Sequence, residues 1–144
     1  MGRIIERLME KYRSLGLLGV IDNIIFLFRK SLMWVYYIGR FKTRGRDITF
    51  EGQMTIVGAK NIKVGSKVVF GSNVKLVSED EGEIIIGDGC FIADNVLISA
   101  RGMVAVGRGT RIHEFSSIEG RDIRLGEDVW VLKVCSLIGI NIAV

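Results

Sequence analysis

Residues 86–97 read IGDGCF and then IADNVL, two six-residue units that share one pattern. Each unit opens with Ile, continues with Gly or Ala, and carries a small residue at its fifth place. The pattern recurs along the chain as VGSKVV, FGSNVK, VGRGTR and LGEDVW. A fixed short period is typical of a repeat architecture, so the fold depends on how such units stack.

The opening residues of the units form rows of three, spaced six residues apart. The complete rows are Val64, Phe70, Leu76; Ile86, Ile92, Ile98; Val106, Ile112, Ile118; and Leu125, Val131, Leu137, after an incomplete row of Phe50 and Ile56. Successive rows lie 22, 20 and 19 residues apart, whereas three six-residue units account for only 18. The additional residues fall at 77–83, 99–103 and 119–122. A stacked coil tolerates insertions that are confined to one corner.

Six residues suffice for one short strand and one turn, so three units close a triangular coil. The opening residues then point inward and stack on the next coil at about 4.8 Å. The fifth place also points inward, and the fourth favours residues that accept positive φ, which Lys67, Phe115 and Val134 do not. We therefore predict an all-β fold, a single-stranded left-handed parallel β-helix over 47–144. A β-sandwich is disfavoured, because its strands have period two and irregular turns.

Charge separates the chain into two parts. Residues 1–46 contain ten Lys or Arg and three acids, whereas residues 47–144 have a net charge of −3. The two cysteines, Cys90 and Cys135, make no disulfide framework and occupy inward small-residue places, so we expect both to be buried. No secretory signal pattern is visible, and we expect a cytoplasmic location, with membrane association left open by the N-terminal segment.

The N-terminal segment, residues 1–46, is predicted to be helical. Residues 3–14 have the pattern of an amphipathic helix, and Gly16 is a helix stop. Residues 17–39 are very apolar, but Asp22, Arg29 and Lys30 disfavour a transmembrane span. Two interpretations stay open. In the first, the segment caps the first coil or makes a subunit contact. In the second, residues 17–46 form an in-plane membrane helix whose cations contact anionic lipid. No nucleic-acid-binding signature is present.

Residues 48–144 resemble the hexapeptide-repeat acyltransferases. IGDGCFIADNVLIS followed by LGEDVWV is similar to the galactoside, maltose and capsular-polysaccharide O-acetyltransferases. The resemblance implies a homotrimer that transfers an acetyl group from acetyl-CoA to a sugar or polysaccharide hydroxyl. It implies a histidine as the catalytic base, and His113 is the candidate, although it lies one strand before the family's histidine loop. It also implies that the acceptor lies near Asp94 and Asn95, and that acetyl-CoA contacts the following residues: Trp130, Lys133 and Ser136.

His113 is the only histidine in the sequence. One histidine cannot supply a three-histidine zinc site, which excludes the γ-class carbonic anhydrases that use the same scaffold, and we expect no metal. A general base needs a partner that fixes its tautomer. Glu114 is adjacent, but successive strand residues point to opposite faces, so Glu114 is not expected to serve. A surface histidine without function remains the alternative.

The sequence departs from the family pattern in two places. The family's histidine loop follows the third strand of the coil before the DVW motif, and here that corner is Glu119, Gly120, Arg121 and Asp122. The family also continues for several coils, whereas this sequence stops at VLKVCSLIGINIAV, so we expect another chain or further sequence to cover that end. A catalytically silent scaffold or oligomer subunit is therefore the second hypothesis. A sugar-nucleotide pyrophosphorylase is weaker, because no Gly-rich nucleotide-binding domain precedes the repeats.

Overall fold

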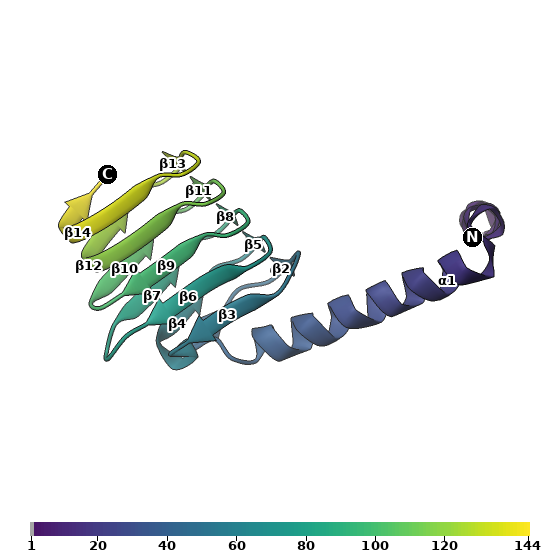
Figure 1. Ribbon diagram of the computed structural model, residues 1–144, viewed down its shortest axis with the longest axis horizontal. Helices are drawn as coiled ribbons and strands as arrows, with labels where there is room; N and C mark the ends of the chain where they lie inside the picture. The colour runs from purple at the N-terminus through teal and green to yellow at the C-terminus, as the bar shows by residue number, and fades with distance from the viewer. Residues whose placement is uncertain (1) are drawn as a thin grey trace. The chain divides into compact units, whose positions relative to one another are not determined.

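The computed structural model describes the backbone from Gly2 to Val144, and it describes the side chains and their exposure for residues 18–144. The chain forms two compact units, residues 1–33 and 34–144, and each is described by itself. The first unit is helical and the second consists mainly of short strands (Figure 1).

Helix α1 (Gly2–Ile38) supplies all of the first unit and the first residues of the second. Its geometry is interrupted at Gly16, with φ 67° and ψ 172°, where the sequence predicts a helix stop. The amphipathic face predicted for residues 3–14 lies outside the described side chains. Further along, large apolar side chains are exposed at Leu18, Ile21, Ile24, Ile25, Phe26, Leu27, Phe28 and Leu32. No helical stretch within the described residues has the length and hydropathy needed to cross a membrane.

The second unit is a parallel β-solenoid of about five turns, as the repeats predict. Its first side consists of β1 (Thr43–Arg44), β4 (Ile62–Val64), β7 (Glu83–Ile86), β10 (Met103–Val106) and the end of β12 (Ser117–Leu125). The second side consists of β2 (Thr49–Phe50), β5 (Val69–Phe70), β8 (Phe91–Ile92), β11 (Arg111–Ile112) and β13 (Trp130–Val131). The third consists of β3 (Met54–Val57), β6 (Val74–Ser78), β9 (Leu97–Ala100), the start of β12 and β14 (Ser136–Ala143); a short 3₁₀ helix, η1 (Ala59–Asn61), follows β3.

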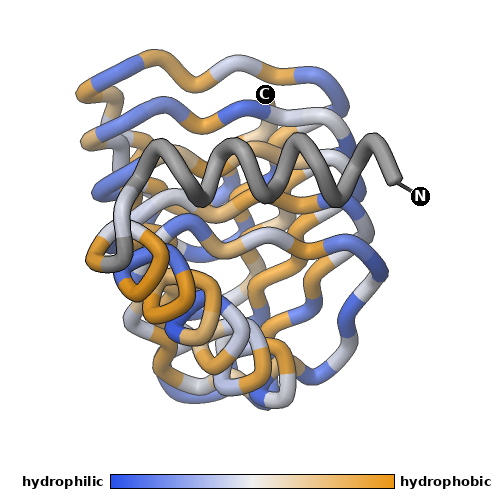
Figure 2. The backbone as a smooth tube through the Cα atoms, turned by 90° about the vertical axis from the view of Figure 1, so that its right-hand side faces the viewer, coloured by the Kyte–Doolittle hydropathy of each residue, from blue (hydrophilic) through white to orange (hydrophobic). Residues whose placement is uncertain are grey.

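The opening residues of successive rows stack directly on one another. On the first side Val64 pairs with Ile86, Ile86 with Val106, and Val106 with Leu125. The same register holds on the third side for Ile56, Leu76, Ile98, Ile118 and Leu137. Apolar and polar residues alternate along the stacked strands (Figure 2), and the apolar set forms the core.

Aromatic residues close the first end of the solenoid. The rings of Phe50 and Phe70 stack with centroids 5.6 Å apart, and Phe41 lies 6.4 Å from Phe50. Tyr37 is buried beside Phe50, and its hydroxyl donates to Met54 O and accepts from Met54 N. These contacts cover apolar surface that the first coil would otherwise expose, and the hydroxyl satisfies two backbone groups at the same time.

The corners impose positive φ whatever residue occupies them. Asn73, Asn95 and Asp128 adopt φ near 55–57°, as their residue types allow. Lys67, Phe115 and Val134 occupy the equivalent places and adopt φ of 57°, 59° and 56°. The ladder of hydrogen bonds between coils therefore overrides local preference, and the cost is greatest for a β-branched residue.

The predicted insertions at 77–83 and 99–103 include the turns that join β6 to β7 and β9 to β10, but the third does not form a loop. Strand β12 continues through residues 119–122, and the corner there is made by positive φ at Gly120 and Asp122. A Cβ on Gly120 would collide with Gly139 O of the next coil. Only glycine permits this close approach of two backbones.

The expectation for the two cysteines is half correct. Cys90 is buried, with its thiol near Gly107 O, and burial raises the pKa of the thiol above its ordinary value. Cys135 is only partly buried. It lies in the last coil of the described solenoid, where the inward side chains of Val129 and Leu137 are also partly exposed.

Candidate functional site

The candidate site lies at the corner that joins the second side of the solenoid to the third. At this corner the residues after β8, β11 and β13 lie on consecutive coils, linked by backbone bonds from Phe115 N to Asp94 O and from Val134 N to Glu114 O. Stacking of parallel coils thus brings together side chains about one row apart in the sequence. Four of the predicted residues, Asp94, Asn95, His113 and Lys133, lie at this corner, and Trp130 lies on β13 just before it.

His113 and Glu114 lie side by side, contrary to expectation. His113 Nδ1 is 4.0 Å from Glu114 Oε2, and both side chains are about one-third exposed or less, at 28% and 33%. The expectation was wrong because strict alternation applies to extended strands, and β11 ends at Ile112. The distance exceeds a hydrogen bond, and the contact is an ion pair only when the imidazole is protonated.

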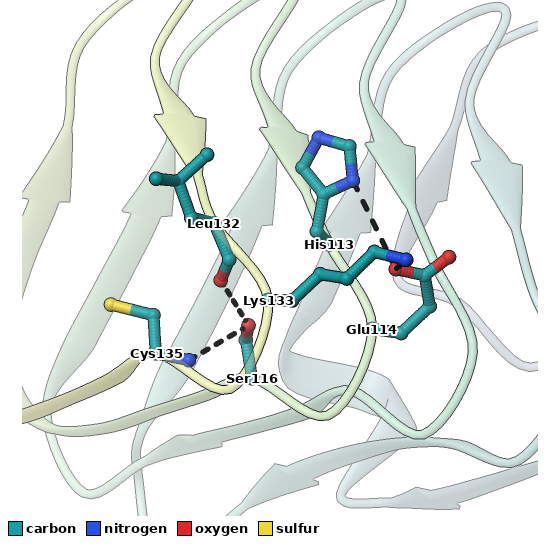
Figure 3. A network of polar contacts seen from close by, with 6 residues as sticks. All are labelled: His113, Glu114, Ser116, Leu132, Lys133 and Cys135. Atoms are coloured by element: carbon teal, nitrogen blue, oxygen red, sulfur yellow. Dashed lines mark hydrogen bonds and ion pairs between the residues drawn. The ribbon is translucent and has the colours of Figure 1, made fainter.

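Glu114 also binds the lysine of the next coil. Lys133 Nζ lies 3.3 Å from Glu114 Oε2, the oxygen that faces His113 (Figure 3). Among the described residues, this oxygen is shielded from solvent and accepts no well-aligned hydrogen bond. The pKa of Glu114 is lowered, mainly by its own backbone amide and then by Lys133, so the group is a carboxylate at neutral pH.

An indole and a guanidinium flank the histidine. The ring centroids of His113 and Trp130 are 6.2 Å apart, and the Arg111 guanidinium lies 5.4 Å from the Trp130 ring centre. Trp130 is 62% exposed. A solvent-exposed indole beside a guanidinium is a surface that can stack on a planar group and attract phosphate.

A buried hydroxyl holds the corner in place. Ser116 Oγ donates to Leu132 O at 2.7 Å and accepts from Cys135 N at 3.3 Å (Figure 3). Thr110 makes the equivalent pair of bonds at another corner, to Gly126 O and from Val129 N. Because Ser116 is 1% exposed, the loss of its hydroxyl would leave two backbone groups without a partner.

Asp94 and Asn95 belong to the coil that precedes Glu114, and their side chains contact the coil before them. Asp94 Oδ1 accepts from Ser72 N at 2.7 Å, and Asn95 Oδ1 accepts from Asn73 Nδ2 at 2.8 Å. Both interactions hold neighbouring coils together. Asp94 is exposed, and its second oxygen has no partner among the described residues.

Ser136 is the predicted residue that lies apart from this corner. It begins β14 on the third side, and its hydroxyl is 2.9 Å from Ser117 Oγ. A separate cavity of about 420 Å³ lies further along that side, against Glu119–Arg121 and Ile138–Ile140, and none of the predicted site residues lines it.

Sequence reasoning missed Glu114 as a partner and did not single out Arg111. The signal was present in the row spacing: a step of 19 residues pairs Glu114 with Lys133 and Arg111 with Trp130. Within the described part of the chain, no three His, Cys, Asp or Glu side chains converge as metal ligands would. The corner therefore offers acid–base and cationic groups from the chain itself.

No protein-family model and no curated protein matches this chain. The fold is a parallel β-solenoid with an N-terminal helix, and the function has to be argued from the groups at its corners.

Proposed function

We propose that the protein is an acyl-CoA-dependent O-acyltransferase that acts on a hydroxyl of a sugar or polysaccharide precursor. The observation that carries the proposal is His113, with Nδ1 4.0 Å from a carboxylate and its ring beside the exposed Trp130. A carboxylate on one side of an imidazole favours the tautomer whose Nε2 accepts a proton. Hydrogen bonds of this kind are often long in ligand-free structures and tighten when substrate binds.

In the proposed reaction, His113 Nε2 removes the proton from the acceptor hydroxyl as its oxygen bonds to the acyl carbon. The carbon–sulfur bond of the thioester breaks, and the departing thiolate receives the proton from the imidazolium. Glu114 holds the imidazole and offsets its positive charge while the proton resides there. Lys133 keeps Glu114 ionised, since it lies 3.3 Å from the same oxygen.

The cationic and aromatic groups around His113 suit a coenzyme A thioester. Its adenine can stack on Trp130, and its phosphates can bind Arg111 and Lys133. Ser136 would lie further along this path, on the third side. The exposed Oδ2 of Asp94 remains available for acceptor hydroxyls, because only Oδ1 is used between coils.

The proposal includes a homotrimer in which neighbouring solenoids meet at this corner. Large apolar side chains are exposed there at Phe115 (65%), Trp130 (62%) and Leu132 (66%). A neighbouring copy that covered them would also exclude water from the thioester. Light scattering after size exclusion would give the mass of the assembly, and a monomer at micromolar concentration would contradict this part of the proposal.

The exposed apolar and basic residues of 17–46 support a further proposal, contact with the membrane surface from the cytoplasmic side. Apolar side chains are exposed from Leu18 to Tyr36, and Arg29 and Lys30 are exposed among them. Sedimentation with anionic vesicles, compared with neutral ones, tests this contact.

A catalytically silent scaffold is the second candidate, and strand β12 favours it. The strand continues through 119–122 without a loop, so that corner supplies no histidine. The two candidates differ in a simple assay: release of free CoA from acetyl-CoA, followed with a thiol reagent, in the presence of a panel of sugars. Turnover that is lost in His113→Ala supports the enzyme. Stable protein with neither turnover nor calorimetric binding of CoA supports the scaffold.

A further inference from the structure

An arginine occupies the first place of an otherwise aliphatic column. Arg44 pairs in register with Val64, and the column continues through Ile86, Val106 and Leu125. Those four side chains are buried, whereas Arg44 is exposed. A guanidinium at the end of an apolar column contributes little to packing, so packing does not explain why arginine occupies this position.

Arg44 lines a cavity of about 590 Å³ together with Arg46, and the remaining lining residues are Trp34, Ile38, Gly45, Asp47 and Ser66. Its volume falls in the range of small-molecule sites, roughly 300–1,000 Å³. All of these residues belong to the unit of residues 34–144.

The two arginines are available to a ligand. Among the residues whose side chains are described, neither has an acidic group within ion-pair distance. Nearby cations are already engaged: Lys42 faces Glu83 at 4.0 Å, and Arg40 bonds to Tyr36 and to Ile56 O. Residues 44 and 46 thus present two planar, permanently charged groups to one cavity.

The backbone beside the arginines is fixed by the next coil. Arg46 N donates to Ser66 Oγ at 3.0 Å, and a Cβ on Gly45 would collide with Ser66. Since Ser66 Oγ accepts that bond, its own proton can be donated into the cavity. Close packing of two coils therefore places a hydroxyl donor next to the guanidinium groups.

The other side chains limit what the ligand can be. Asp47 places a carboxylate in the same cavity. This carboxylate would repel an anion that filled the whole cavity, but it can accept hydrogen bonds from the hydroxyl groups of a ligand. Trp34 presents an indole whose nitrogen donates to Ile48 O at 3.2 Å, so its orientation is fixed. The combination suits a phosphate joined to a hydroxylated carbon skeleton.

We propose that this cavity binds the phosphate group of a phosphorylated polyol, with phosphate on Arg44 and Arg46, hydroxyls on Asp47 and the carbon skeleton against Trp34. The ligand is either a lipid headgroup or a soluble phosphate ester. This site uses no residue of the His113 corner, so it can be tested independently of the proposed acyl transfer.

The test uses the full chain and one probe for each source, a soluble phosphate monoester and a lipid headgroup. Glycerol 3-phosphate is titrated by calorimetry, and equimolar phosphatidylglycerol–phosphatidylcholine vesicles are compared with phosphatidylcholine vesicles by sedimentation. The double variant Arg44→Gln, Arg46→Gln should weaken binding by roughly a hundredfold, about tenfold for each guanidinium. Lys60→Gln, Lys75→Gln is the matched control, because it removes the same charge from exposed residues that do not line the cavity.

A third variant should gain binding, which a misfolded protein cannot do. Asp47 adopts φ 58°, a conformation that asparagine accepts, so Asp47→Asn should fold normally. It should bind inorganic phosphate more tightly and lose the preference for glycerol 3-phosphate over inorganic phosphate. Binding of the soluble probe, of the anionic vesicles, or of both supports the site and identifies its source when the double variant weakens that binding and the control keeps it. The proposal is overturned if neither probe binds, if the control loses as much as the double variant, or if Asp47→Asn leaves the preference unchanged.

Discussion

Lys133 Nζ lies 3.3 Å from Glu114 Oε2, and the two residues are joined only through the stacking of neighbouring coils. Their separation of 19 residues is the spacing between the last two rows of the repeat. The register between neighbouring coils thus determines the geometry of the candidate site. Substitutions at this corner can therefore be tested separately for their effects on stability and on catalysis.

The first prediction concerns the acid dependence of stability. The pKa of Glu114 is lowered in the folded protein from its ordinary value of 4.5, so its stabilising effect is present above that value and is lost as pH falls through the folded pKa. The difference in unfolding free energy between wild type and Glu114→Gln should therefore shrink from neutral pH to strongly acidic pH. Lys133→Met removes one cause of the shift and should weaken the same dependence. Denaturant melts that gave a constant difference would contradict the assignment.

The second prediction concerns catalysis. If His113 is the general base, His113→Ala should lower kcat for acetyl transfer by roughly 10²–10⁴-fold. Glu114→Gln should lower kcat with little change in KM, because the imidazole loses the carboxylate that orients it. Lys75→Gln, which changes an exposed residue of β6 on the third side, is a control expected to keep wild-type activity. An unchanged kcat in Glu114→Gln would show that this residue does not position the imidazole.

The third prediction concerns the strained corner of the last coil. Val134 has φ 56° and is 77% exposed, so it bears the cost of a left-handed conformation without a gain from packing. Val134→Asn should stabilise the protein by about 1–2 kcal/mol. The exposed Leu132 is a matched control, because it has no positive φ and Leu132→Asn should bring no comparable gain. Thermal melts followed by circular dichroism would measure both.

The fourth prediction concerns the buried hydroxyl of Ser116. Ser116→Ala should destabilise the protein by about 1–3 kcal/mol, because Leu132 O and Cys135 N would lose their shared partner. Ser117→Ala removes a hydroxyl whose partner, Ser136 Oγ, is exposed to water, and its effect should be much smaller. Equal effects in urea unfolding would mean that water replaces the Ser116 hydroxyl.

The columns of the core could be predicted from sequence because each one repeats the same residue class at the row spacing. Val64, Ile86 and Val106 stack as their spacing predicts. The position of Arg44 in this column was not predicted, because a charged residue breaks the aliphatic pattern even though its strand pairs normally. The first coil therefore begins at β1, before the Phe50 and Ile56 that the pattern identified.

The contacts of the candidate site were harder to predict. Alternation separates His113 from Glu114 in an extended strand, but it ends where the chain turns the corner. Residue preference is likewise a poor guide at Phe115 and Val134, where hydrogen bonds between coils impose positive φ. In both cases an interaction between coils determines the conformation, and a local pattern contains little information about it.

The aromatic stack of Phe41, Phe50 and Phe70 has a consequence for how this chain opens. Each coil touches only its neighbours, so cooperativity runs along a single axis. The rings cover the inward side chains of the first coils, which are buried together with them. The coils beside the aromatic stack should therefore open rarely, and their amide protons should exchange slowly with solvent.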